Sequence, residues 1–315
     1  MKLYRRLSDL GREKRKIRLA AGFFDGVHRG HQAVIRRVIA QAKRHGEAAW
    51  IMTFDSHPLR LLQPHAAPPL LTSLGHKIGL IGACGVQGCV ILRFTRSMAG
   101  VNPVKFVARL VKMVPNLRGM VVGSNWTFGR HGAGTPALLK KLGALHGFDV
   151  TVVRPLRWRG GLISSTRIRR AVAGGRLDEA AAMLGRKFNV LGAVVSGRGI
   201  GRKLGIPTAN VNLHNEVAPA NGVYAVRAVI EHRTFDGVAN IGIRPTFADA
   251  GKKPGERRKK ILEVHLFDVR ADLLGRDIEV FFVKKIRAER RFPSLQALKH
   301  RIARDIGAAR KILGA

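Results

Sequence analysis

The sequence predicts an α/β domain with a parallel sheet, followed by a domain rich in antiparallel β-structure. In the first half, short apolar runs alternate with segments of helical periodicity, which is typical of parallel strands joined by crossover helices. In the second half, apolar runs are separated mainly by glycine and proline, which favours an antiparallel barrel or sandwich. The pattern changes near Ser164, and we place the boundary near Gly185, giving domains of residues 1–185 and 186–315.

Apolar runs predict the strands and helices of the first domain. The helix after the first strand has Val34, Ile35, Val38 and Ile39 at helical spacing. Because ligands of parallel sheets bind beyond the carboxyl ends of the strands, the loop between this strand and this helix is the first candidate site. The expected strands are 17–23, 48–54, 86–92 and 117–123, and the expected helices are 32–43, 103–113 and 136–146.

The second half begins with two short helices and continues with β-strands. A terminal helix follows, for which Ser294 is a suitable N-cap residue. The expected helices are 165–174, 176–184 and 294–308, and the expected strands are 191–195, 222–229, 235–241, 262–267 and 278–283.

Composition indicates an ordinary globular protein in a reducing compartment. The chain has 315 residues, 46% hydrophobic and 24% charged, enough for two domains with cores of their own. Its two cysteines, Cys84 and Cys89, are too few for a disulfide framework or a four-thiolate metal site. The first residues are polar and basic, and no apolar run approaches the roughly 18 residues of a membrane span. We therefore expect a cytoplasmic protein without a membrane segment.

The net charge of +37 favours anionic partners such as nucleotides, nucleic acid or a membrane surface. Lysine and arginine number 57, against 20 acidic residues, and the excess is spread over both halves. A nucleic-acid module more often concentrates its charge on one face or tail. Solvated surface charge is therefore the favoured interpretation, and nucleic-acid binding stays possible.

The segment GFFDGVHRGHQ, residues 22–32, has the pattern of a phosphate site. A strand, a glycine turn and a helix start present backbone N–H groups to a phosphate. His28 and His31 lie at the turn and at the head of the helix, where imidazoles can stabilise charge on an attacked nucleotide α-phosphate. A metal site is the weaker alternative, because it needs a third ligand such as His57 or His65.

Segments in both halves resemble, in order, the bacterial bifunctional riboflavin kinase/FMN adenylyltransferase family. This resemblance implies a Rossmann-like nucleotidyltransferase domain of the H-x-G-H type, then an antiparallel β-barrel riboflavin kinase domain with a C-terminal helix. It implies ATP, riboflavin and FMN as substrates and Mg²⁺ as a cofactor with ATP. The segments are GFFDGVHRGHQ, TFDSHP, LLTSLGHK, VVGSNWTFGRHGAG, ISSTRIR, GRGIGRKLGIPTAN, NGVYAV, NIGIRPTF, EVHLFD and IRAERRF.

In the first domain, the resemblance implies that His28 and His31 stabilise the transition state of adenylyl transfer. Asn125 matches a position that commonly contacts flavin, whereas Phe128 is expected in the core. Hydroxyls ahead of a helix and an arginine fork suit phosphate oxygens. The implied ATP-phosphate residues are Gly22, Phe23, Asp25, Gly26, Ser164, Ser165, Thr166 and Arg167. The family often has asparagine where this chain has Phe23, which concerns the shape of the loop.

In the second domain, Thr208 and Asn210 are two residues apart, so an extended strand turns both to one side. Their oxygens suit Mg²⁺ bound with ATP, although a turn with a polar edge is an alternative. Glu263 lies among apolar residues, where a carboxylate is costly unless it is functional or paired. The resemblance implies that Glu263 is the general base for riboflavin, with a salt bridge as the alternative. It also implies that Gly197, Gly201, Lys203 and Pro207 contact ATP, and Arg287 and Phe292 the flavin.

A second function class stays open at this point. The chain could be a basic paralogue that has lost one or both activities and binds RNA or another polyanion. Against this, a pure binding protein has no physical need to keep the proposed catalytic set together, which is His28, His31, Ser165, Thr208, Asn210 and Glu263. The sequence leaves the oligomeric state undetermined.

Overall fold

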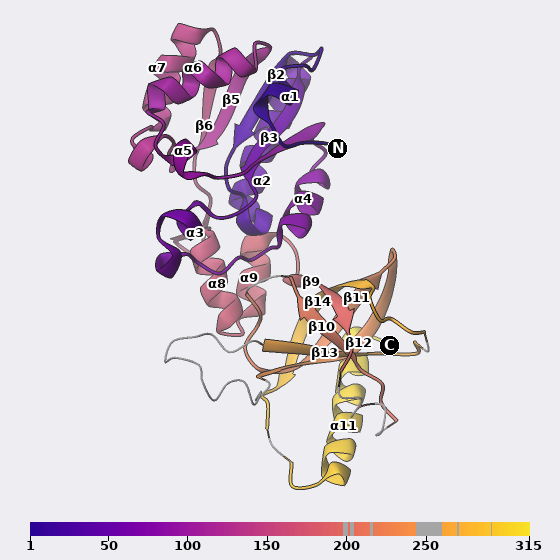
Figure 1. Cartoon of the computed structure of the whole chain (residues 1–315). Coiled ribbons are helices and arrows are strands. Elements are labelled where there is room, and N and C mark those ends of the chain that lie inside the picture. Colours follow the sequence, from indigo (N-terminus) through magenta and orange to yellow (C-terminus); the bar gives the residue numbers. More distant parts are fainter. Residues whose placement is uncertain (198–200, 202–204, 215–216, 244–259, 270, 291) are drawn as a thin grey trace. The chain divides into compact units, whose positions relative to one another are not determined.

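The computed structural model describes residues 1–197, 201, 205–214, 217–243, 260–269, 271–290 and 292–315. The chain forms two compact units (Figure 1). The first contains Met1–Pro69 and Leu74–Ser165, and the second contains Leu70–Ser73 and Thr166–Ala315. Helices α8 (Ser165–Ala173) and α9 (Leu177–Leu184) fall almost wholly in the second unit. The domain boundary near Gly185 stays a prediction.

The first unit is built on a six-stranded sheet in the order β1-β4-β3-β2-β5-β6. Every neighbouring pair is parallel, which confirms the predicted α/β class. Strands β3 and β5 have the predicted bounds, whereas the edge strands β1 and β6 were not predicted. The strands are β1 Lys2–Tyr4, β2 Ile17–Ala21, β3 Ala48–Phe54, β4 Gly88–Leu92, β5 Leu117–Gly123 and β6 Asp149–Val153.

Helices cover both faces of this sheet because its strands are apolar on both sides. Along β3, Trp50 belongs to one core cluster and Ile51 to the other. Helix α2 packs in the cluster of Ile51, and helices α6 and α7 pack in the cluster of Trp50. The helices of this unit are α1 Leu7–Leu10, α2 Arg29–Arg44, α3 Pro58–Leu62, α4 Leu74–Gly82, α5 Arg96–Ala99, α6 Pro103–Met113 and α7 Pro136–His146; a small hairpin, β7 Arg157–Trp158 and β8 Gly161–Leu162, completes it.

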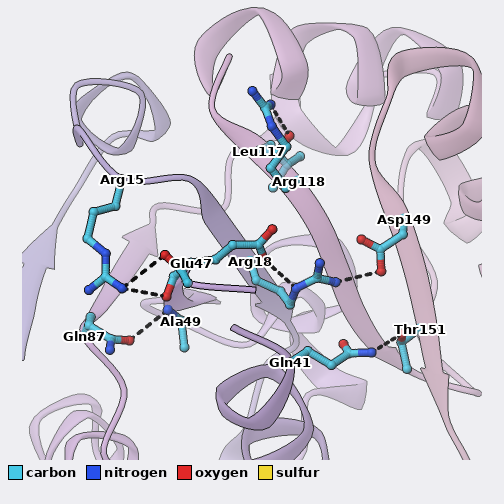
Figure 2. A network of polar contacts seen from close by, with 11 residues as sticks. Arg15, Arg18, Gln41, Glu47, Ala49, Gln87, Leu117, Arg118, Asp149 and Thr151 are labelled. Atoms are coloured by element: carbon cyan, nitrogen blue, oxygen red, sulfur yellow. Dashed lines mark hydrogen bonds and ion pairs between the residues drawn. The ribbon is translucent and has the colours of Figure 1, made fainter. Parts of the chain in front are cut away.

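An ion network centred on a buried arginine joins the amino-terminal ends of three strands (Figure 2). Arg18, near the start of β2, is 3% exposed. Its Nε donates to Glu47 at 2.7 Å, and its Nη1 donates to Asp149 at 2.6 Å. A Cβ at Gly119 would lie 2.2 Å from Arg18 Nη1, so the neighbouring strand leaves room for the guanidinium only because it has glycine there.

The second unit is a closed antiparallel barrel in the strand order β10-β13-β12-β11-β14-β9. The sequence left a barrel or a sandwich open, and the structure shows the barrel. Ser294 caps the C-terminal helix as predicted, since its Oγ accepts the Ala297 N–H at 3.1 Å. The elements are β9 Asn189–Val195, β10 Ala209–Leu213, β11 Gly222–Ile230, β12 Arg233–Ile243, β13 Lys260–Leu266, β14 Asp277–Arg287 and α11 Leu295–Leu313. Within the described ranges, every helix is too short or too polar to cross a membrane.

Candidate active sites in the two units

The loop between β2 and α2 has an unusual backbone. Phe24, Gly26 and Val27 have φ angles of 56°, 77° and 39°. A left-handed backbone is costly for phenylalanine and for β-branched valine, so the surrounding structure must hold it in place. Phe24 and Val27 are each 2% exposed, and a Cβ at Gly22 would lie 2.9 Å from the Phe24 ring. The loop is therefore anchored by two buried side chains and by the absence of one at Gly22.

The two histidines of this loop lie against each other at the N-terminus of α2. Their ring centroids are 3.6 Å apart, with the planes inclined by 18°. His28 Nδ1 accepts the backbone N–H of His31 at 3.3 Å, so a neutral His28 carries its proton on Nε2 and can donate it to an anion. Phe24 packs against His31 in an edge-to-face contact of 5.3 Å. The positive end of the helix dipole and two imidazoles thus meet at one point.

The ISSTRIR segment reaches the same loop. Ser165 Oγ donates to the Asp25 carbonyl oxygen at 3.1 Å, which brings two predicted phosphate-binding segments together although they are 140 residues apart. Ser164 and Ser165 are half-buried. Thr166 and Arg167 belong to the second unit, and their place at the phosphates stays a prediction.

The predicted flavin-side segment follows the carboxyl end of β5. Asn125 is exposed in the turn after this strand. Trp126 stacks on Phe128 at 4.9 Å, and Phe128 is 7% exposed within the core, as predicted. A role for Asn125 in flavin binding stays a prediction.

Lys77, on α4, is a residue at this site that sequence reasoning missed. It is 3% exposed, and its Nζ donates to the carbonyl oxygens of Phe23 at 3.2 Å and Phe54 at 2.7 Å. Burial lowers its pKa to about 8, and the charge of Asp25 opposes part of that decrease. The available signal was the position of Lys77 at the end of the LLTSLGHK segment.

The metal alternative for the histidine pair receives no structural support. Among the residues that the structure describes, no group of three or more His, Cys, Asp or Glu side chains is placed to hold a metal ion. Cys84 and Cys89 are not joined in a disulfide. Burial raises the pKa of Cys89 to about 12, so this thiol stays protonated, as expected of a small apolar core residue.

A half-open cavity of about 800 Å³ is lined by strands of the barrel and by α11, with a row of polar side chains along the wall that the strands form. Glu263 on β13 is paired in register with Asn210 on β10 and with Asn240 on β12. All three residues line the cavity, together with Thr208. A carboxylate, two amides and a hydroxyl therefore share one surface. Asn240 was missed, although it begins the NIGIRPTF segment.

Two glycines allow the preceding chain to approach this row closely. A Cβ at Gly197 would lie 2.0 Å from Asn210 Nδ2. A Cβ at Gly201 would lie 2.4 Å from the Ile206 carbonyl oxygen and 2.9 Å from Thr208 Oγ1. Any side chain at either position would displace the oxygens predicted to serve Mg²⁺. Lys203 lies outside the described residues.

Arg287 and Phe292, the predicted flavin-side residues, both line the cavity. The Arg287 guanidinium donates to the carboxylate of Asp305 on α11, with contacts from 2.7 to 3.0 Å. Asp305 is 3% exposed and also accepts from Arg301 at 3.1 Å. The Phe292 ring lies 5.5 Å from the Arg287 guanidinium. Arg287 thus ties the end of β14 to α11. Asp305, like Lys77 and Asn240, is a residue that sequence reasoning missed.

The chain is a two-domain enzyme by its family matches, and each unit has a candidate site of its own. A model of FAD synthetase matches residues 11–167, and a model of riboflavin kinase matches residues 184–313. The chain belongs to the bifunctional riboflavin kinase/FMN adenylyltransferase family.

Relatives match over essentially the whole chain. The bifunctional riboflavin kinase/FMN adenylyltransferase of Escherichia coli K12 is 40% identical, covering 100% of this chain and 98% of the relative. That of Pseudomonas fluorescens is 37% identical, covering 99% and 98%. A solved structure from Streptococcus pneumoniae, titled a macrolide-efflux protein, superposes with a TM-score of 0.85 at 29% identity over 98% of both chains. The family expected from the sequence is confirmed.

Proposed function

We propose that the two units catalyse consecutive reactions. The barrel transfers the γ-phosphate of ATP to riboflavin and forms FMN, and the parallel-sheet unit transfers AMP from a second ATP to FMN and forms FAD. The observation that carries the proposal is the presence of two different polar sites in one chain. One is a histidine pair at a helix N-terminus, and the other is a carboxylate flanked by amides in a barrel cavity.

In adenylyl transfer, a phosphate oxygen of FMN attacks the α-phosphorus of ATP. The new P–O bond forms while the bond to the bridging α–β oxygen breaks, and pyrophosphate leaves. His28 Nε2–H and the His31 ring donate to the non-bridging oxygens, where negative charge increases in the transition state. No covalent intermediate with the enzyme is needed.

The remaining phosphate contacts of this unit come from two segments. The loop contributes backbone groups through Gly22, Phe23, Asp25 and Gly26, and the Ser165–Asp25 bond holds the second segment beside it. In our proposal the phosphates of ATP are bound by Ser164, Ser165, Thr166 and Arg167, and the flavin of FMN by Asn125.

In the kinase reaction, Glu263 accepts the proton of the ribityl 5′-hydroxyl of riboflavin. The resulting oxygen attacks the γ-phosphorus of ATP, the bond to the β–γ bridging oxygen breaks, and ADP leaves. Asn240, paired with Glu263 across β12 and β13, lies where its amide can orient the carboxylate or the hydroxyl.

The donors beside Glu263 fit a hard cation. Thr208 and Asn210 offer a hydroxyl and an amide oxygen, and Gly197 and Gly201 let the backbone lie against these side chains without displacing them. We propose Mg²⁺ here, which when bound neutralises charge on the ATP phosphates. Gly197, Gly201, Lys203 and Pro207 would contact the same phosphates, and Arg287 and Phe292 the flavin. We also propose a cytoplasmic location, in keeping with two cysteines that form no disulfide and with the need for ATP.

Two single substitutions test this division of labour. Glu263→Gln keeps the size of the side chain and removes the base, so FMN formation from riboflavin should fall by about 10²- to 10⁴-fold, while FAD formation from supplied FMN continues. His31→Asn should have the opposite effect. Both rates are measured by chromatographic separation of the flavins. Loss of both activities in both variants would contradict two independent sites.

A further inference from the structure

Lys77 is a buried cation to which the proposed chemistry assigns no role. It lies beside the loop between β2 and α2, which carries His28. Its Nζ and the hydroxyl of Thr53 both donate to one acceptor, the Phe23 carbonyl oxygen, at 3.2 Å and 3.0 Å. Thr53 is 0% exposed and Lys77 is 3% exposed. Nζ also lies 4.2 Å from the centroid of the Phe23 ring. The Phe23 peptide is therefore fixed by two buried donors from β3 and α4.

This anchoring acts on a residue whose backbone is strained. The Phe23 carbonyl belongs to the peptide bond that leads into Phe24, whose φ of 56° is unfavourable for a residue with a side chain. A fixed Phe23 carbonyl limits rotation of that peptide and so holds Phe24 in the left-handed region. The Phe24 ring then contacts His31 edge-to-face, and His31 stacks on His28.

We propose that Lys77 is a positioning residue for adenylyl transfer, which holds the histidine pair in its reactive arrangement through the Phe23 carbonyl and the Phe24 ring. The inference rests on the proposed adenylyltransferase function of this unit. Lys77 itself acts on neither imidazole ring directly and does not touch the reacting phosphates. A second donor bond, to the Phe54 carbonyl at 2.7 Å, ties the loop to the carboxyl end of β3.

The anchoring of the Phe23 carbonyl depends on pH because Lys77 can lose its charge. Burial has the largest effect on the pKa of Lys77, and the carboxylates of Asp25 and Asp55 oppose it. The Cys89 thiol is also nearby, but it is neutral in this pH range because its pKa is about 12. The Lys77 pKa of about 8 means that the ammonium is present at neutral pH and lost in moderately alkaline solution. A neutral amine is a weaker donor than an ammonium, so the anchoring weakens as pH rises above this value.

The test compares Lys77→Met, Lys77→Arg and a surface control, Lys43→Met, at an exposed position in the last turn of α2. For Lys77→Met we expect kcat for FAD formation from supplied FMN to fall by about 10- to 100-fold, because small displacements of reacting groups carry costs of this order. KM for ATP and FMN should change by less than about threefold. Lys77→Arg should recover part of the rate and keep it to higher pH, and Lys43→Met should match wild type.

FMN formation from riboflavin in the same samples reports whether the second unit is intact. The inference would be overturned if Lys77→Met left unchanged both kcat for FAD formation and the decrease of this kcat at alkaline pH. The inference would also be overturned if Lys77→Arg lost as much of the rate as Lys77→Met at every pH. If Lys77→Met does not fold, Thr53→Val removes the other bond to the Phe23 carbonyl, and a wild-type kcat in that variant would equally overturn it. If wild type itself forms no FAD from FMN, the proposed function fails instead.

Discussion

Substitution of Arg18 should destabilise the first unit strongly, although Arg18 lies near the amino-terminal end of β2, whereas the loop with His28 and His31 follows its carboxyl end. Arg18 is 3% exposed and Glu47 is 6% exposed, and they are joined by a contact of 2.7 Å. Arg18→Met leaves the Glu47 carboxylate buried without its cation, a change that costs about 3–5 kcal/mol. The contact to Asp149 adds little, because Asp149 is 53% exposed and water can replace the guanidinium.

Urea unfolding followed by tryptophan fluorescence measures this cost in the first unit alone. The chain has three tryptophans, Trp50, Trp126 and Trp158, and all lie in that unit. With a slope of about 2 kcal/mol per molar urea, the midpoint for Arg18→Met should fall by about 1.5–2.5 M.

The matched controls separate the buried pair from the exposed one. Asp149→Asn should shift the unfolding free energy by less than about 1 kcal/mol. Replacing both Arg18 and Glu47 by methionine removes the unpaired charge and should restore most of the stability, to within about 2 kcal/mol of wild type. If Arg18→Met costs less than 1 kcal/mol, or if the double variant is as unstable as the single one, the reasoning from buried charge is refuted.

Three further predictions follow from other contacts. In the barrel, Gly197→Ala places a Cβ 2.0 Å from Asn210 Nδ2, so KM for Mg-ATP in FMN formation should rise by about 10-fold, a loss of about 1.4 kcal/mol of binding; unchanged kinetics would show that Asn210 does not serve ATP. Asp305→Ala leaves the partly buried Arg287 guanidinium without its main partner, so amide hydrogen exchange in α11 should accelerate, and unaltered exchange would contradict the anchoring role. Burial lowers the pKa of Lys77 to about 8 in the folded chain, against 10.5 for an ordinary lysine. The unfolded state therefore binds more protons between these values, and stability should rise with pH across that window, by up to about 3 kcal/mol. Urea midpoints at pH 7 and pH 10 check this last prediction, because Lys77→Met should lose that increase.

Much of the fold could be predicted because the relevant signals are local. The apolar run of β3 and the periodicity of α6 and α7 predicted those elements with the observed bounds. Edge strand β1 has three residues and β6 five, and β6 begins with an exposed aspartate, so neither has a strong apolar signal. The choice of a barrel over a sandwich depends on pairing between β9 and β10 and between β9 and β14, which no short segment specifies.

For the candidate sites too, local signals could be predicted and distant contacts could not. Residues inside compact segments, such as His28, His31 and Glu263, could be named from the sequence. Residues that act through a distant partner could not: the Lys77 bond crosses 54 positions to Phe23, and the pairing of Asn240 with Glu263 depends on barrel register. Arg287 could be named, but its engagement by Asp305 could not, because that contact requires the docked position of α11.

The most direct test of two consecutive reactions follows each phosphate of ATP into the flavin products. Purified protein is incubated with riboflavin, Mg²⁺ and ATP labelled at either the γ- or the α-phosphate, and the flavins are separated by chromatography. Two consecutive reactions predict that γ-label enters FMN first and then FAD, whereas α-label enters FAD only. Absence of label from both flavins, or α-label in FMN, would show that the chain does not catalyse these two reactions.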